Sequence, residues 1–172
     1  MSPASGIHEA LAALRERLDG CVLDHGLSNG DEWIQVETGR LGEACRLLRD
    51  ELGYNQLCFL TAVDHLPKSP RFELIVQVRS HSRATSLRLR CLLDDEHPSA
   101  PSLAEVWLNS DWDERETWEM FGIQFPPRTT MRHLLLPSDW VGYPLRRDYP
   151  VGGEAVAFSE DRELWMSPPP GA

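Results

Sequence analysis

The chain has 172 residues, of which 41% are apolar and 26% charged, and these values are typical of a soluble globular domain with a buried core. Its formal net charge of −10 argues against nucleic-acid binding, because phosphate contacts require a basic surface. The longest mainly apolar run, Leu57 to Val63, is too short to cross a bilayer, and the N-terminus has no signal-peptide pattern. We therefore expect a cytosolic chain, or one that contacts a membrane only peripherally.

Two helices are predicted in the first third of the chain. The first carries one apolar stripe at helical spacing and ends at Gly20; the stripe consists of Ile7, Leu11, Leu14 and Leu18. The second begins after Thr38, which can cap it, and ends at Gly53. Its stripe consists of Leu41, Ala44, Leu47, Leu48 and Leu52.

Five strands are predicted around these helices, over residues 21–25, 32–37, 56–64, 71–79 and 84–94. Asn29-Gly30 predicts a hairpin turn between the first two, since both residues tolerate positive φ. The order of elements favours an α+β fold, with one mostly antiparallel sheet and both helices packed on one of its faces.

The second half of the chain has a different character. Residues 102–108 are expected to form a short helix or bend, and a further helix is predicted over 111–121, capped by Ser110 or Asp111 and ended by Gly122. From Pro126 to Pro150 there are five prolines, which predict an extended strap with one short helix at residues 131–136.

The expected organisation is therefore an α+β domain over 1–125, a partner-binding strap over 126–150 and a flexible tail over 151–172. The strap contains Arg128, Arg132, Arg146 and Arg147 against Asp139 and Asp148, a net charge of +2 on an acidic chain. Such a segment is expected to contact something other than solvent.

On a helical wheel of residues 111–121, apolar and charged positions alternate all the way round, whereas an ordinary surface helix has one apolar stripe. We expect this helix to be contacted on more than one side. Arg115 is expected to pair with Asp111 and Glu119, and the strap arginines with the remaining acids. A protein–protein interface explains paired charges among large aromatic residues best. A catalytic acid cluster and a plain helix at the edge of the core are the alternatives.

Motifs for chemistry are absent from the sequence. Cys21, Cys45, Cys58 and Cys91 have no CxxC spacing, so they are expected to be buried and reduced. There is no HExxH, GxSxG or phosphate-binding glycine loop. Glu116 and Glu119 are close enough to share a ligand, which keeps a small carboxylate-dependent metal enzyme as a rival. We predict no catalytic, cofactor-binding or metal-binding residue.

Two ordered stretches resemble one known family. ERETWEMFGIQF, followed by Arg132, Leu134 and Leu135 and then by VGYPLRRDYP, is similar to the signature of the 30-kDa subunit of respiratory complex I, the proton-pumping NADH–quinone oxidoreductase. The resemblance implies a non-redox structural and assembly subunit of the hydrophilic arm, at the cytoplasmic side of the cell membrane. NADH, FMN, iron–sulfur clusters and quinone would be bound by other subunits. The implied partners are the 49-kDa-like quinone-site subunit and the subunit with the terminal iron–sulfur cluster.

The resemblance also implies which residues form the partner interface: Glu114, Arg115, Glu116, Trp118, Glu119, Phe121, Arg128, Arg132, Gly142, Pro144, Leu145, Arg146, Arg147, Asp148 and Tyr149. The chain departs from the family pattern at Glu119, where Asp is common, at Tyr143, and at Pro126-Pro127-Arg128, which replaces Gly-His-Pro. The homologous subunit of membrane-bound [NiFe] hydrogenases shares this module and is the alternative assignment.

Overall fold

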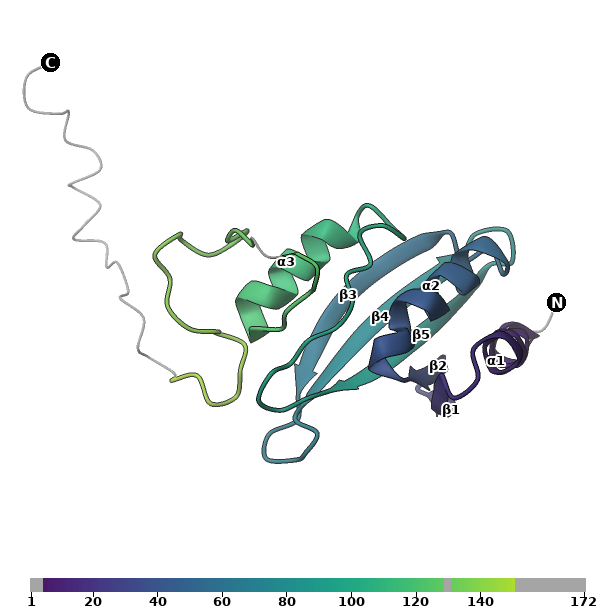
Figure 1. Cartoon of the computed structure of the whole chain (residues 1–172), viewed down its shortest axis with the longest axis horizontal. Helices are drawn as coiled ribbons and strands as arrows, with labels where there is room; N and C mark the ends of the chain where they lie inside the picture. The colour runs from purple at the N-terminus through teal and green to yellow at the C-terminus, as the bar shows by residue number, and fades with distance from the viewer. Residues whose placement is uncertain (1–4, 129–130, 151–172) are drawn as a thin grey trace, which may run out of the picture.

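A computed structural model describes residues 5–128 and 131–150. Its elements, in chain order, are α1 (Ser5–Arg17), β1 (Val22–Ser28), β2 (Asp31–Val36), the 3-10 turn η1 (Thr38–Arg40), α2 (Leu41–Asp50), β3 (Gln56–Asp64), β4 (Phe72–Ser80), β5 (Thr85–Leu93) and α3 (Ser110–Phe121). The strands form one sheet in the order β1-β2-β5-β4-β3 (Figure 1). All neighbouring strands are antiparallel except β2 and β5. The predicted α+β fold is confirmed.

The hairpin between β1 and β2 follows directly from its turn residues. Asn29 and Gly30 have φ values of 54° and 89°, the pair of positive angles that a type I′ turn requires. The alternation predicted for β2 is also present, since Ile34 and Val36 are both fully buried. One face of the sheet is therefore apolar from its first hairpin onward.

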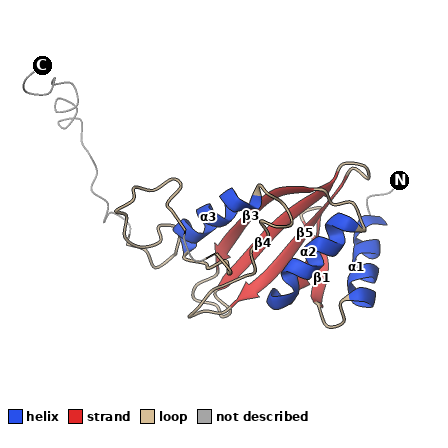
Figure 2. Cartoon of the chain, turned by 45° about the horizontal axis from the view of Figure 1, so that its top comes forward, coloured by secondary structure: helices blue, strands red, loops and turns tan. Residues whose placement is uncertain are grey.

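The core lies between this face of the sheet and the helices α1 and α2, which Figure 2 shows packed on the same side. Leu14 of α1 and Leu48 of α2 are fully buried against it. The inward residues of β4 are also fully buried; they are Phe72, Leu74, Val76 and Val78. The opposite face of the sheet carries charged residues, among them Arg90, which lies over the ring of Trp33 at 4.6 Å.

Helix α3 lies along β3, the edge strand of the sheet (Figure 1). Its side chains satisfy backbone groups that the edge would otherwise leave unpaired. Asp113 accepts a hydrogen bond from the Leu60 N–H at 3.1 Å, and Asn109 donates to the Leu57 carbonyl at 3.0 Å. Covering the edge in this way protects it from pairing with another chain. None of the helices in the described ranges is long and apolar enough to span a bilayer.

Several local predictions were wrong. Thr38 does not cap α2; its hydroxyl donates to the Leu92 carbonyl at 2.9 Å, and the Glu37 carboxylate accepts from the Gly39 N–H instead. Helix α3 begins at Ser110 without a side-chain cap from Ser110 or Asp111, since the preceding Asn109 is itself helical in φ and ψ.

Two further expectations were also wrong. Residues 131–136 form no helix, and only 134–136 are bends. Cys58 is exposed, at an irregularity in the register of β3, while the other cysteines are buried. The tail predicted over 151–172 lies outside the described residues.

Candidate functional site

The candidate site is α3 together with the strap that folds over it, and the first of its buried carboxylates is Glu114. Its side chain is fully buried. It accepts hydrogen bonds from the Leu103 N–H at 2.6 Å, from Ser102 Oγ at 2.8 Å and from Ser110 Oγ at 3.1 Å. Arg128 supplies the balancing charge at 3.1 Å. Glu114 thus joins the turn before α3 to the start of the strap, all within one chain.

Glu119 makes equivalent contacts with the middle of the strap. Its side chain is also fully buried, and it accepts from the backbone N–H groups of Leu134 at 2.7 Å and Leu135 at 2.8 Å, with longer contacts to the Leu136 N–H and to His133. Burial alone would raise the pKa of Glu119, but these hydrogen bonds outweigh it and hold the pKa below its ordinary value. Because the amides of 134–136 converge on one carboxylate, the segment bends instead of forming a helix.

Of the ion pairs predicted for the arginines around this helix, those of Arg128 are found and those of Arg115 are not. Arg128 contacts Asp111 at 2.6 Å as well as Glu114, as expected of a strap arginine. Arg115 does not pair with Asp111 or Glu119. It donates to the carbonyls of Arg132 at 3.2 Å and His133 at 3.1 Å, and its guanidinium lies 5.2 Å from the ring centre of Trp112.

These contacts explain why charged and apolar positions alternate around α3. The helix is contacted on more than one side, as predicted, but by its own chain: Asp113 and Thr117 face β3, whereas Glu114 and Glu119 face the loop before the helix and the strap. Glu116 is exposed. Burial of the two inward glutamates is tolerated because each is fully hydrogen-bonded.

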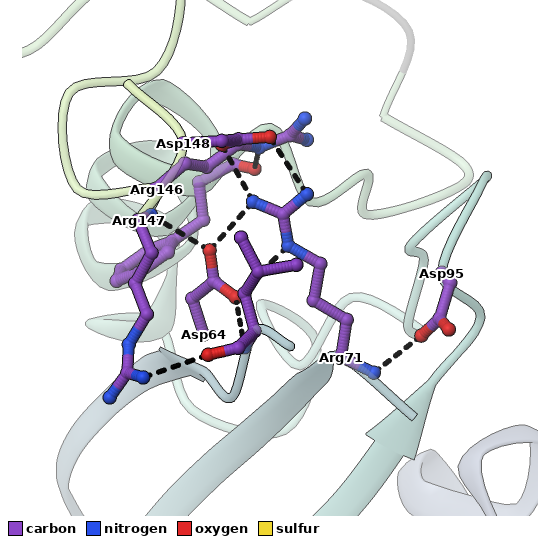
Figure 3. Close-up of polar contacts among 8 residues, drawn as sticks. Asp64, Arg71, Asp95, Arg146, Arg147 and Asp148 are labelled. Carbon is purple, nitrogen blue, oxygen red and sulfur yellow. Dashed lines mark hydrogen bonds and ion pairs between the residues drawn. The ribbon is translucent and has the colours of Figure 1, made fainter. Parts of the chain in front are cut away.

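The end of the strap is anchored by a second network, drawn in Figure 3. Arg71 binds the Asp64 carboxylate through two nitrogens, at 2.9 and 2.7 Å, and the Asp148 carboxylate through two contacts at 2.9 and 2.7 Å. The Arg147 N–H also donates to Asp64 at 2.9 Å. Asp148, which was expected at the partner interface, therefore forms an ion pair within its own chain.

Burial alone would raise the pKa of Asp64, but hydrogen bonds from Arg71, Arg147 and Leu66 outweigh it and hold the pKa well below its ordinary value. Asp64 stays ionised at neutral pH as a result. Sequence reasoning missed this anchor. Asp64 and Arg71 flank the hairpin loop between β3 and β4, and a carboxylate facing an arginine across a hairpin was the available signal.

Arg146 holds the strap against the C-terminal end of α3. Its Nε donates to the Phe121 carbonyl at 2.6 Å, and its guanidinium lies 4.4 Å from the ring centre of Tyr143 and 5.0 Å from that of Phe72. Gly122 makes this approach possible: its φ is +77°, and a Cβ there would lie 2.5 Å from Arg146 Nη2. Gly122 ends the helix as predicted.

The predicted interface residues divide by exposure. Glu114, Glu119 and Phe121 are buried by the chain itself. Arg115, Trp118, Arg128, Pro144, Arg146 and Tyr149 are half-buried, and Glu116, Arg132, Gly142, Leu145, Arg147 and Asp148 are exposed. Fewer of the predicted interface residues are therefore accessible to a partner than the sequence motif alone indicated.

The exposed apolar side chains of this region define what we term the outer strap surface. It consists of Trp112 (57% exposed), Leu135 (63%), Val141 (85%) and Leu145 (55%). Only Leu145 was among the predicted interface residues. Single exposed apolar residues are common, but several on one helix and its strap are typical of a surface that another protein covers.

A metal-binding interpretation of the acidic helix finds no support in the geometry. Within residues 5–128 and 131–150 no three His, Cys, Asp or Glu side chains are placed to share an ion. Glu116 and Glu119 are the pair that could share a ligand. The Glu119 carboxylate accepts hydrogen bonds from strap amides, while Glu116 is exposed.

Comparison with known proteins identifies the family of the chain. Residues 34–155 match the family described as respiratory-chain NADH dehydrogenase, 30 Kd subunit. An NADH-quinone oxidoreductase subunit of Roseiflexus sp. (strain RS-1) is 37% identical over 155 residues, which cover 89% of each chain. The corresponding protein of Citrifermentans bemidjiense is 36% identical over 146 residues, covering 85% of this chain and 91% of its own.

Two solved structures share the fold. The trypsin-resistant fragment of Nqo5 superposes with a TM-score of 0.61 at 21% identity, over 73% of this chain and 96% of the fragment. A chain of the membrane-bound sulfane sulfur reductase, an archaeal respiratory membrane complex, gives 0.67 at 15% identity, over 93% of this chain and 91% of its own. The chain belongs to the family of the 30-kDa subunit of the respiratory-chain NADH dehydrogenase.

Proposed function

We propose that this chain is a non-redox structural and assembly subunit of the hydrophilic arm of a membrane-associated NADH–quinone oxidoreductase. The observation that carries the proposal is the strap, whose fold is fixed by buried carboxylates of the same chain while its apolar side chains face outward. Relatives that are 36–37% identical over most of their length are named as a subunit of this enzyme.

The internal contacts have a direct consequence for association. An extended segment of some twenty residues loses conformational entropy when it docks, and a strap that is already ordered loses less. Glu114, Glu119 and Asp64 fix the strap before any partner arrives. The outer strap surface can then bury its apolar side chains at a smaller entropic cost.

The partners we propose for this surface are the 49-kDa-like quinone-site subunit and the subunit with the terminal iron–sulfur cluster. In this arrangement the chain keeps those two subunits in register. Electrons pass from NADH to quinone, coupled to proton translocation, through FMN and iron–sulfur clusters that other subunits hold. The proposed location is the cytoplasmic side of the cell membrane, reached by binding to the complex.

The hydrogenase-type complex remains the alternative of the same class. The likeness to the sulfane sulfur reductase chain is at 15% identity and concerns the fold alone. The more similar relatives bear the NADH–quinone oxidoreductase name, and this favours the first assignment.

The test is to tag the chain in its native host, solubilise the membranes gently and identify what co-purifies. Iron–sulfur subunits with NADH–quinone activity are expected. A hydrogenase large subunit would move the chain to the alternative complex, and recovery of the chain alone would contradict both assignments.

Two matched variants test the surface in the same experiment. Leu145→Asp places a charge on the outer strap surface, whereas Leu23→Asp places one on β1 at nearly equal exposure, 58% against 55%. The first should reduce recovery of the partners and the second should not. Equal recovery of both variants would refute the assignment of this surface.

A further inference from the structure

A pocket of about 390 Å³ lies where the strap meets the body, between residues 96–99, the residues that follow α3, and the strap at 143–146. Its lining includes Ser99, Gln124, Tyr143 and Arg146. The pocket exists because the strap is held in place on either side. The Leu145 N–H donates to the Met120 carbonyl at 3.1 Å, and Asp148 binds Arg71.

Arg146 is the one charged group of the strap in this pocket, and its guanidinium is only partly used. Its Nε donates to the Phe121 carbonyl, but within the described residues neither terminal nitrogen has a hydrogen-bond or ion-pair partner. By contrast, dashed lines in Figure 3 connect the terminal nitrogens of Arg71 to the carboxylates of Asp64 and Asp148. Arg128 likewise has carboxylate partners at 2.6 and 3.1 Å.

The guanidinium of Arg146 is also fixed in position. Two aromatic rings lie against it, one hydrogen bond holds its Nε, and the backbone of Gly122 packs close to Nη2. Burial lowers the pKa of Arg146, which nevertheless stays charged at neutral pH. A half-buried, ordered and charged guanidinium whose outer edge has no acceptor is a site that a second group is expected to fill.

The shape of the free edge specifies that group. The terminal nitrogens of a guanidinium donate in a planar fork that matches a carboxylate. Glu96 also lines the pocket and is exposed, so a polyanion such as a nucleotide would be repelled. A single carboxylate on an otherwise uncharged segment fits both features.

We propose that this pocket receives the carboxylate of an Asp or Glu side chain from a neighbouring subunit, bound by the terminal nitrogens of Arg146. The assignment rests on the proposed function, because it needs a partner on the strap side. Leu145, next in the chain, is part of the outer strap surface, so an acidic side chain entering the pocket would come from the same partner that covers Leu145.

Arginine footprinting with phenylglyoxal, which attacks free terminal nitrogens, tests the proposal on the unmodified protein. Arg146 should react in the isolated chain and become at least tenfold slower in the purified complex. Arg71, whose nitrogens are paired, should be slow in both, and the exposed Arg79 on β4 should react in both. Equal reactivity of Arg146 in the free chain and in an intact complex would overturn the proposal and leave the proposed function standing. Failure to recover any complex would contradict both this proposal and the proposed function.

A second measurement identifies what enters the pocket. A photo-reactive amino acid at Ser99, on the pocket lining, should cross-link in the complex to a partner peptide containing Asp or Glu. A cross-linked peptide without an acidic residue would contradict the proposal. The proposal would also be contradicted if sodium acetate slowed the reaction of Arg146 with phenylglyoxal in the isolated chain while assembly into the complex did not slow it. That result would assign the pocket to a small carboxylate.

Two arginine-to-lysine substitutions add the energetic test. Arg146→Lys keeps the charge and removes the planar fork, and partner recovery should fall about tenfold, the effect of losing one charge-assisted pair. Arg79→Lys is the matched control, since the Arg79 side chain is exposed on β4 and lies outside the predicted interface; recovery should stay within about twofold. Equal recovery of the two variants would contradict the proposal.

Discussion

Replacing Glu119 with Gln changes one charge and almost no volume, so it isolates the contribution of the carboxylate to the strap. The carboxylate makes two short bonds, to the amides of Leu134 and Leu135 at 2.7 and 2.8 Å. A hydrogen bond to a charged group contributes about 1.5–3 kcal/mol. Glutamine keeps one acceptor oxygen and turns an NH₂ group toward the other amide. We therefore expect the variant to lose about 2–4 kcal/mol of unfolding free energy, from one lost bond and one unpaired buried donor.

Two measurements on the purified chain check this. Urea unfolding reports the free energy, and hydrogen exchange of the amides of Leu134 and Leu135 reports local opening of the strap, which need not accompany global unfolding. Glu116→Gln is the matched control, because Glu116 lies on the same helix and is exposed; it should change stability by less than about 0.5 kcal/mol. If Glu119→Gln were equally stable and its strap amides equally protected, the inference that buried carboxylates fix the strap would be wrong.

Arg71→Met should cost about 3–5 kcal/mol in urea unfolding, because it leaves the Asp64 carboxylate buried and unpaired; a loss below about 1 kcal/mol would show that the network is dispensable. Gly122→Ala should destabilise the chain more than Gly20→Ala. Both glycines have a positive φ, +77° and +72°, at which an alanine is strained by about 1–2 kcal/mol. Only at Gly122 would the added Cβ also contact the strap. Equal losses for the two variants, measured by thermal unfolding, would argue against close docking of the strap. The folded-state pKa values of Asp64 and Glu119 are depressed. Their contribution to stability is therefore fully present above the unfolded values of about 4, and it is lost as the pH falls from those values through the lower folded-state values. Urea midpoints should therefore fall from pH 6 to pH 3, and flat midpoints would contradict the depressed pKa values.

The regular elements could be predicted from the sequence because their signals are local. Alternation fixed the inward face of β2, and Asn29-Gly30 specified its turn. The helix caps were predicted less well, since Thr38 found a better acceptor in the Leu92 carbonyl, 54 residues along the chain. Local pattern does not show which distant group competes for a side chain.

The candidate site was predictable as a segment and unpredictable in its geometry. Alternating charge around α3 correctly indicated contacts on several sides, but Glu114, Glu116 and Glu119 are chemically alike in the sequence. The strap decides which of them are buried, and its position depends on contacts such as that between Arg71 and Asp148, 77 residues apart. A helix that binds a partner and a helix that binds its own strap have the same sequence pattern.

The motif residues therefore divide between these two roles. The buried members stabilise the strap, and we propose that the exposed members, with Trp112, Leu135 and Val141, contact a partner. Substitution of a buried member should act through the stability of the isolated chain. Substitution of an exposed member should act only through association, except at Asp148 and Arg147, whose side chains also bind Arg71 and the Leu66 carbonyl.

The most direct test of the proposed role of the strap is hydrogen exchange on the chain alone and in the complex captured from its native host. We predict new protection on assembly in α3 and in the strap at 131–149, with little change in α1. Protection confined to α1 or to the charged face of the sheet, with the strap unchanged, would contradict this role.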